Sequence, residues 1–377
     1  MLYLKRFATI LALLVTSMIG AQADLDQERI LLTFIPNVQF APFYVGLQHG
    51  TFSEVGFDVE LEHLQEPEVL DLVAVGQANY GIVSGEQVIL ARSRGRDVVY
   101  VFEWFQQYPV ALVHSSELDL SNLEQLRGLK IGIPGRFGAS YSGLTTLLNS
   151  AGLTESEIEL NEIGFNAPEV FCLGAVDAAI VYANNEPLQI RNLTDAGECG
   201  DLEDVEVLTV ASQVDLVSNG LIVNRSQLEE MPYQIARMVG AFREALRITI
   251  DNPAGAYLAS LSYVDTLPSD DALITALTEA AARQQAFLAD GPSRAEVAGS
   301  RRTMLEGLSR QFDGALLAQF HVLLDSIELW DADTLGYSDL VSWEAMRDIL
   351  ALMNLLGDDL GDLGAAFSNE FVSVSDE

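Results

Sequence analysis

The most telling stretch of the chain is Ile30–Gly46, which reads ILLTFIPNVQFAPFYVG. It begins as a run of β-forming apolar residues, breaks at Pro36-Asn37 and continues with amides and aromatic rings in a helical pattern. This order brings the turn to the carboxyl end of a first strand, where open α/β sheets hold their ligands. The stretch therefore predicts a receptor for a flat polar molecule rather than an enzyme. The ligand contacts that it predicts are Asn37, Gln39, Phe40 and Tyr44.

The first 23 residues have the three parts of a secretory signal peptide. Lys5 and Arg6 precede the apolar residues 7–19, and Ala21-Gln22-Ala23 supplies the small residues of a cleavage site. The alternative is an uncleaved membrane anchor, but the apolar part is shorter than the roughly 20 residues that a span needs. We therefore expect an exported protein that works in the periplasm or another extracytoplasmic space.

Length and charge narrow the class of protein. The chain has 377 residues, 49% of them hydrophobic, which after the leader predicts two domains with sizeable cores. Its formal net charge of −35 excludes nucleic acid as a default partner, because phosphate contacts need basic patches. A negative surface also keeps a protein soluble, so it says more about the surroundings than about the ligand.

Cysteine and histidine give no sign of a metal or cofactor site. Cys172 and Cys199 are the only cysteines, and in an exported protein they form either one disulfide or two buried thiols. The four histidines are scattered without the spacing of metal ligands. We expect no metal, no cofactor and no catalytic residue.

Alternating strand and helix patterns run through the first two thirds of the chain, which predicts sheets of parallel strands with helices on both faces. We expect lobe 1 to comprise residues 24–114 and 220–377, and lobe 2 to comprise residues 115–219. The chain would cross between them near Leu112–Leu118 and Asp215–Leu221, which would form a hinge. From Ser226 onwards the pattern is mostly helical. The expected helices there are Tyr233–Asp251, Ala254–Leu261, Asp270–Asp290, Arg301–Trp330 and Trp343–Leu356.

Other loop positions carry groups that suit an aromatic ligand. Flat rings with polar edges are held by stacking aromatics and by fixed amides and carboxylates. The turn before Tyr141 opens a helix whose free N–H groups can receive an oxygen atom. Glu86 has a second interpretation, since a carboxylate at a helix start also complements the helix dipole. The further predicted contacts are Glu86, Gln87, Trp104, Tyr108, Ser140, Tyr141, Tyr182, Asn184 and Glu186.

Several phrases of the sequence together resemble a known family. They are Pro36-Asn37 followed by Pro42–Val45, His49–Phe52 before Val55–Val59, Leu129–Gly135, and Asn185-Glu186-Pro187. In order and spacing they are similar to the periplasmic solute-binding proteins of the thiamine-pyrimidine (NMT1/THI5-like) type. The resemblance implies a type II periplasmic-binding fold, in which two α/β lobes joined by a hinge close on a small molecule. It further implies delivery of that molecule to an ABC permease. The helical pattern from Ser226 onwards would add a helical C-terminal extension to this fold.

Within that family the residues Val38–Tyr44 look most like the riboflavin-uptake branch, with the thiamine-pyrimidine branch next. Gln39-Phe40 stands where pyrimidine binders often carry a histidine, which leaves the heterocycle open. Two alternatives remain, a sulfonate or nitrate receptor and a pyrimidine-related enzyme on the same fold. The first should place a basic residue in the pocket, for which Arg136 is the obvious candidate, and the second lacks its family's cysteine-rich run here. We expect a monomeric receptor.

Overall fold

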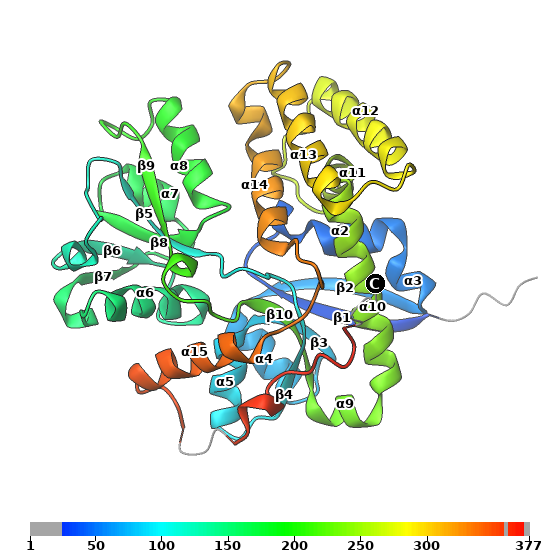
Figure 1. The fold of residues 1–377 in the computed structure, drawn as a ribbon, viewed down its shortest axis with the longest axis horizontal. Helices are drawn as coiled ribbons and strands as arrows, with labels where there is room; N and C mark the ends of the chain where they lie inside the picture. Colours follow the sequence, from blue (N-terminus) through cyan, green and yellow to red (C-terminus); the bar gives the residue numbers. More distant parts are fainter. Residues whose placement is uncertain (1–24, 358–360, 373–377) are drawn as a thin grey trace, which may run out of the picture.

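The computed structural model describes residues 25–357 and 361–372. The predicted signal peptide, residues 1–23, lies outside this part of the chain. Two five-stranded sheets form two lobes that lie side by side, and a group of C-terminal helices packs beside the first lobe (Figure 1). Over the described ranges no helix combines the length and apolar character that a bilayer span requires.

The first sheet has the order β2-β1-β3-β10-β4. β1 pairs in parallel with β2 and β3, whereas β10 runs antiparallel to β3 and β4. In this sheet β1, β2, β3 and β4 therefore point the same way, as expected, and only β10 is reversed. β10 reverses direction because it returns from the second lobe instead of following a helical crossover. The strands are β1 (Asp26–Thr33), β2 (Phe57–Leu64), β3 (Tyr80–Ser84), β4 (Val98–Glu103) and β10 (Asn219–Asn224).

The second sheet has the order β7-β6-β8-β5-β9, with β5 antiparallel to both of its neighbours. β5 was expected at the end of lobe 1, but its apolar residues are buried on both faces and find partners on both sides only in this sheet. The chain therefore passes between the sheets at residues 104–109 and 210–218, a few residues before the expected crossings. The strands are β5 (Val110–Ser115), β6 (Lys130–Ile133), β7 (Glu159–Glu162), β8 (Ala178–Tyr182) and β9 (Val205–Thr209).

Alternation along the strands sends side chains to different cores. Ile30 and Leu32 of β1 join the core under α2 and α10, while Leu31 joins the core under α4 and α5. In the second sheet, Leu112 packs toward α6 and Val113 toward α7 and α8. The helices are α2 (Ala41–His49), α3 (Thr51–Glu54), α4 (Glu66–Ala74), α5 (Gly85–Ser93), α6 (Gly138–Ser150), α7 (Ala167–Cys172), α8 (Glu186–Asp195), α9 (Arg225–Glu230) and α10 (Pro232–Asp251).

Five more helices form the C-terminal extension. The expected single helix Arg301–Trp330 is wrong, because the chain breaks at 310–313 and Asp313 caps the second part by accepting the Leu316 N–H at 2.9 Å. α14 packs against α8 of the second lobe, and α15 contacts both α5 and α6. The extension therefore touches both lobes. Its helices are α11 (Pro253–Ser260), α12 (Asp271–Leu288), α13 (Arg294–Ser309), α14 (Gly314–Trp330) and α15 (Leu340–Leu352).

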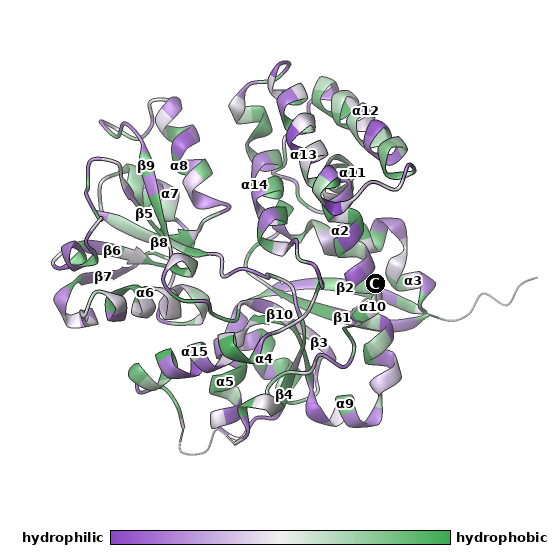
Figure 2. Cartoon of the chain, in the orientation of Figure 1, coloured by the Kyte–Doolittle hydropathy of each residue, from purple (hydrophilic) through white to green (hydrophobic). Residues whose placement is uncertain are grey.

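Hydropathy follows this layering. Strands β3 and β4 are buried throughout and mostly hydrophobic, and the helices on the outside carry hydrophilic stretches (Figure 2). A disulfide joins Cys172, at the end of α7, to Cys199 in the loop after α8. It lies beside the smallest of the three cores, which contains Phe171 and Ile190.

Candidate ligand-binding site

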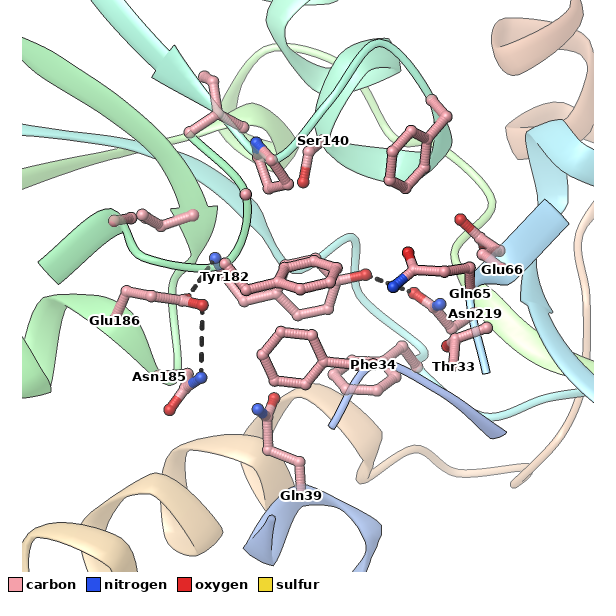
Figure 3. Close-up of a pocket in the computed structure, with 18 of the residues that line it drawn as sticks. Thr33, Phe34, Gln39, Gln65, Glu66, Ser140, Tyr182, Asn185, Glu186 and Asn219 are labelled. Carbon is pink, nitrogen blue, oxygen red and sulfur yellow. Dashed lines mark hydrogen bonds between the residues drawn. The ribbon is translucent and has the colours of Figure 1, made fainter. Parts of the chain in front are cut away.

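A pocket lies between the two sheets, at the ends of strands from both lobes (Figure 3). It encloses about 950 Å³ free of protein atoms, its open side included. Its lining is Thr33, Phe34, Gln39, Phe40, Gln65, Glu66, Trp104, Phe105, Pro134, Phe137, Ser140, Gly164, Phe165, Ala167, Ile180, Val181, Tyr182, Asn185, Glu186 and Asn219.

Aromatic rings build the wall of the first lobe. The Phe40 and Trp104 rings lie with centroids 5.6 Å apart, and Trp104 stacks on Trp330 of α14 at 5.6 Å. Phe43 meets Trp104 edge to face at 5.3 Å from behind. The indole N–H of Trp104 is buried and has no partner in the part of the chain that the structure describes. This wall is therefore an apolar surface of packed rings.

Two phenylalanines meet across the pocket from opposite lobes. The ring of Phe34, just after β1, contacts the ring of Phe165, just after β7, edge to face with centroids 4.7 Å apart. Phe34 has φ 69°, a left-handed conformation that a large side chain rarely adopts. Such strain is common at functional sites, because it aims a side chain that a relaxed backbone would point elsewhere.

The wall of the second lobe presents a carboxyl group. Glu186 begins α8, and its carboxylate accepts the Tyr182 backbone N–H at 2.9 Å and the Asn185 side-chain N–H at 3.4 Å (Figure 3). Burial raises the pKa of Glu186, although these hydrogen bonds oppose the shift. The Tyr182 hydroxyl donates to Asn219 Oδ1 at 2.9 Å, which ties this wall to the start of β10. Glu186 is therefore held in one place with part of its carboxyl group facing the pocket.

A second carboxyl group belongs to a buried pair. Glu66 accepts the Ser84 backbone N–H at 2.6 Å, and the Ser84 hydroxyl lies between Glu66 and Glu86. One hydroxyl hydrogen cannot serve both carboxylates. Burial raises the pKa of both groups, and the charge of Glu66 further raises that of Glu86. The two carboxyl groups therefore compete for one hydroxyl hydrogen, and burial makes both of them harder to ionise.

The start of α6 approaches this pair from the second lobe. Gly138 has φ 66°, and a side chain there would collide with the Glu66 carboxylate. Only glycine allows this contact between the lobes.

Six of the predicted contacts line the pocket. They are Gln39, Phe40 and Trp104 from the first lobe, and Ser140, Tyr182 and Glu186 from the second.

The other predicted contacts do not line the pocket. Asn37 caps the turn Val38–Phe40 by accepting the Gln39 N–H at 2.8 Å. Tyr44 is buried and stacks on Tyr263 with centroids 4.8 Å apart, because helical spacing turns it toward the core. Glu86 lies behind Ser84, and Gln87 is buried beside it on α5.

The remaining predicted contacts also have partners away from the pocket. The Tyr108 hydroxyl donates to the Ala139 carbonyl at 2.7 Å. The Tyr141 hydroxyl donates to Glu155 at 2.8 Å on the outer side of α6. Asn184 is buried and donates to Gln39 and Ser326 instead of facing the pocket.

Four of the lining residues that the sequence did not single out follow a strand directly. Phe34 comes immediately after β1 and Pro134 after β6, while Gln65 and Glu66 follow β2. Ligand sites of α/β sheets gather at the carboxyl ends of strands. Reading each residue after a predicted strand would therefore have found these four lining residues.

The lining carries acidic but no basic side chains: its only ionisable acids are Glu66 and Glu186, and none of its members is Lys, Arg or His. Arg136, the candidate for binding an anion, is exposed and pairs with Glu155 at 2.8 Å and with Glu162. Within the described residues no three His, Cys, Asp or Glu side chains form a group suited to a metal ion. The lining thus offers hydrogen-bonding groups and carboxyl groups but no cation that could pair with an anionic ligand.

Comparisons with known proteins agree with this geometry. The family described as "NMT1/THI5 like" matches residues 37–256. The riboflavin-binding protein RibY of Chloroflexus aurantiacus is 29% identical over 94% of this chain and 88% of its own. Shorter matches are the formylaminopyrimidine-binding protein of Halalkalibacterium halodurans, 28% identical over 43% of this chain and 49% of its own, and the 4-amino-5-hydroxymethyl-2-methylpyrimidine phosphate synthase of Legionella pneumophila, 21% identical over 47% and 54%.

Among solved structures, the periplasmic aliphatic sulphonate binding protein SsuA of Escherichia coli superposes with a TM-score of 0.52 at 18% identity, covering 76% of this chain and 93% of that protein. This likeness confirms the expected two-lobed periplasmic-binding fold.

Proposed function

The chain belongs to the NMT1/THI5-like family, and on that basis we propose that it is the extracytoplasmic solute-binding component of an ABC importer and that its ligand is riboflavin. The first sheet with the C-terminal helices would form one lobe, and the second sheet the other. Ligand would dock between them, the lobes would close about the two connections, and the permease would recognise the closed form. The signal peptide predicted at residues 1–23 would export the chain, which would act as a monomer.

One observation carries the choice of ligand: the pocket has aromatic rings and amides but no basic side chain in its lining. Riboflavin has a flat three-ring system, a polar edge of carbonyl and N–H groups, a chain of hydroxyls and no charge. Phe34, Phe165 and Tyr182 offer rings for the flat system. Gln39, Asn185 and Asn219 offer amides for its edge, and Glu186 can accept from an N–H or hydroxyl group.

The other candidate functions have less support than riboflavin binding. A thiamine-type pyrimidine is the second candidate, because the Halalkalibacterium halodurans relative binds a formylaminopyrimidine. A sulfonate or nitrate would meet Glu66 and Glu186 without a facing cation, which makes binding of an anion unfavourable. The enzyme alternative draws only on the shorter match to the Legionella pneumophila synthase, whereas the relative matched along nearly the whole chain is a binding protein.

The experiment is a titration of the purified, ligand-stripped protein by calorimetry with riboflavin, flavin mononucleotide, formylaminopyrimidine and an alkanesulfonate. We expect riboflavin to bind tightest and flavin mononucleotide at least tenfold more weakly, because its phosphate brings negative charge toward two carboxyl groups. Glu186→Ala should weaken riboflavin about tenfold, the effect of roughly 1.4 kcal/mol from a lost charge-assisted bond. Glu198→Ala, an exposed glutamate of the same lobe, is the matched control. Tight pyrimidine or sulfonate binding without riboflavin binding would overturn the assignment.

A further inference from the structure

A chain of hydrogen bonds joins three distant segments beside the pocket. Asn184, between β8 and α8 of the second lobe, donates from Nδ2 to Gln39 Oε1 at 2.8 Å and to Ser326 Oγ at 2.6 Å. Gln39 belongs to the first lobe and Ser326 to α14 of the C-terminal extension. Asn184 and Ser326 are 2% and 0% exposed, so water does not compete for these bonds.

The direction of these hydrogen bonds is fixed by Ser326, the last residue in the series. The Ser326 hydroxyl donates to the Val322 carbonyl at 2.6 Å, and a carbonyl oxygen can only accept. Ser326 Oγ must therefore accept from Asn184, which turns the NH₂ group of Asn184 toward it. The second hydrogen of the same group points at Gln39. The Asn184 carbonyl is left buried without a partner among the described residues, so the two donated bonds decide how this amide sits.

This direction determines what Gln39 offers to a ligand. Gln39 rises from the turn Val38–Phe40 toward the pocket (Figure 3). Its Oε1 is occupied by Asn184, while its Nε2 has no hydrogen-bond partner in residues 25–357 and 361–372. The group left to face the pocket is an N–H donor.

We propose that Asn184 and Ser326 are positioning residues that hold the Gln39 amide so that it donates to an acceptor atom of the ligand, a carbonyl oxygen or an unprotonated ring nitrogen. The inference rests on the proposed function in taking this pocket as the ligand site. It gives the C-terminal extension a role, because Ser326 of α14 sets the direction of these hydrogen bonds. It also couples recognition to closure, since Asn184 reaches Gln39 and Ser326 only when the lobes are together.

The test replaces the donor by an acceptor of the same shape. Asn184→Asp removes both N–H groups, and its carboxylate attracts the N–H of Gln39, so the glutamine carbonyl turns to the pocket. We expect riboflavin to bind at least tenfold more weakly by calorimetry. Ser326→Ala, which leaves Asn184 free to turn, should weaken binding about threefold. Asn149→Asp adds the same charge at an exposed site on α6 of the same lobe and should leave the affinity unchanged.

A double-mutant cycle separates positioning from direct contact. In a Gln39→Ala background, Asn184→Asp should cause little further loss, because the group that it positions is gone. A full additional loss there, or riboflavin binding by Asn184→Asp equal to the parent's, would overturn the inference while leaving the proposed function intact.

If the parent protein itself fails to bind riboflavin, the proposed function fails and a ligand-independent readout decides the inference. Hydrogen exchange of the Asn184 side-chain N–H groups, followed by NMR, should be slow in the parent and at least tenfold faster in Ser326→Ala. Equal exchange in the two proteins would overturn the inference.

Discussion

The two walls of the pocket are held in place by different means. The wall of the first lobe rests on a cluster of rings, in which Trp104 touches Phe40, Phe43 and Trp330. The wall of the second lobe rests on a small core and on the disulfide between Cys172 and Cys199. Substitutions in the wall of the first lobe should therefore lower the stability of the fold, because its rings are also part of the core. The second lobe instead presents its polar groups on a segment that a disulfide holds in place.

The largest effect should come from removing the central ring of the first wall. Trp104→Ala should lower the free energy of unfolding by about 3–5 kcal/mol, because it leaves a large cavity among packed rings. Phe137→Ala truncates a ring of the second wall that is only half-buried, and should cost about 1 kcal/mol or less. Urea denaturation followed by circular dichroism measures both.

The control for this comparison is Trp104→Phe, which keeps an aromatic ring and removes the buried unpaired N–H. It should cost clearly less than Trp104→Ala. Equal losses for Trp104→Ala and Phe137→Ala would show that the two walls do not differ in this way.

The second prediction concerns the covalent link. The disulfide closes a loop with a sequence separation of 27 residues, and this loop contains β8, Tyr182 and Glu186. Replacing both cysteines by alanine should lower the free energy of unfolding by about 3 kcal/mol, since the unfolded chain regains the entropy of an open loop. Reduction of the parent with dithiothreitol should give a similar loss, and the double variant should not respond to it. A loss below about 1 kcal/mol would assign the stability of this wall to its core instead.

The sequence predicted structural features that depend on long patterns of residues, and it missed features that depend on a single residue. The first strand and the two-lobed fold follow from the alternation of apolar runs with helical periods, which needs many residues to agree. The break between α13 and α14 contains no proline, and its clearest local signal is Asp313, which caps the start of α14. Helical spacing turns Tyr44 toward the core, but it could not show that Tyr263 is its partner there.

The contacts between residues far apart in the sequence could not be predicted either. Asn184 has a side-chain amide of the kind that binds polar ligands. Only the tertiary structure reveals that Gln39 and Ser326 accept both of its N–H groups. Phe34 and Phe165 lie 131 positions apart in the sequence and meet only because both follow strands that end at the same cleft. No spacing along the chain encodes such a pair.

The smallest of the three effects should arise at the junction of the walls, where Glu103 ends β4. Its carboxyl group is buried beside Ser218, whose N–H it accepts at 3.4 Å, and burial is the main reason that its pKa rises to about 8 from the usual 4.5. The folded state thus binds this proton more tightly than the unfolded chain. The resulting stability is fully present below pH 4.5 and is lost as the pH rises through about 8.

Glu103→Gln keeps this position neutral at every pH, so comparing it with the parent isolates the titration. At pH 9 the free energy of unfolding of the variant should exceed that of the parent by about 2 kcal/mol. One pKa unit corresponds to about 1.4 kcal/mol, so this value is a conservative one for the raised pKa of Glu103. At pH 4 the two should unfold alike. Glu124→Gln, an exposed glutamate of the second lobe, should show no such divergence in urea denaturation at the two pH values. If Glu103→Gln gained nothing at pH 9, the carboxyl would have to be ionised and stabilised inside the fold. The junction would then hold a fixed negative charge between a ring-built wall and a disulfide-bound one.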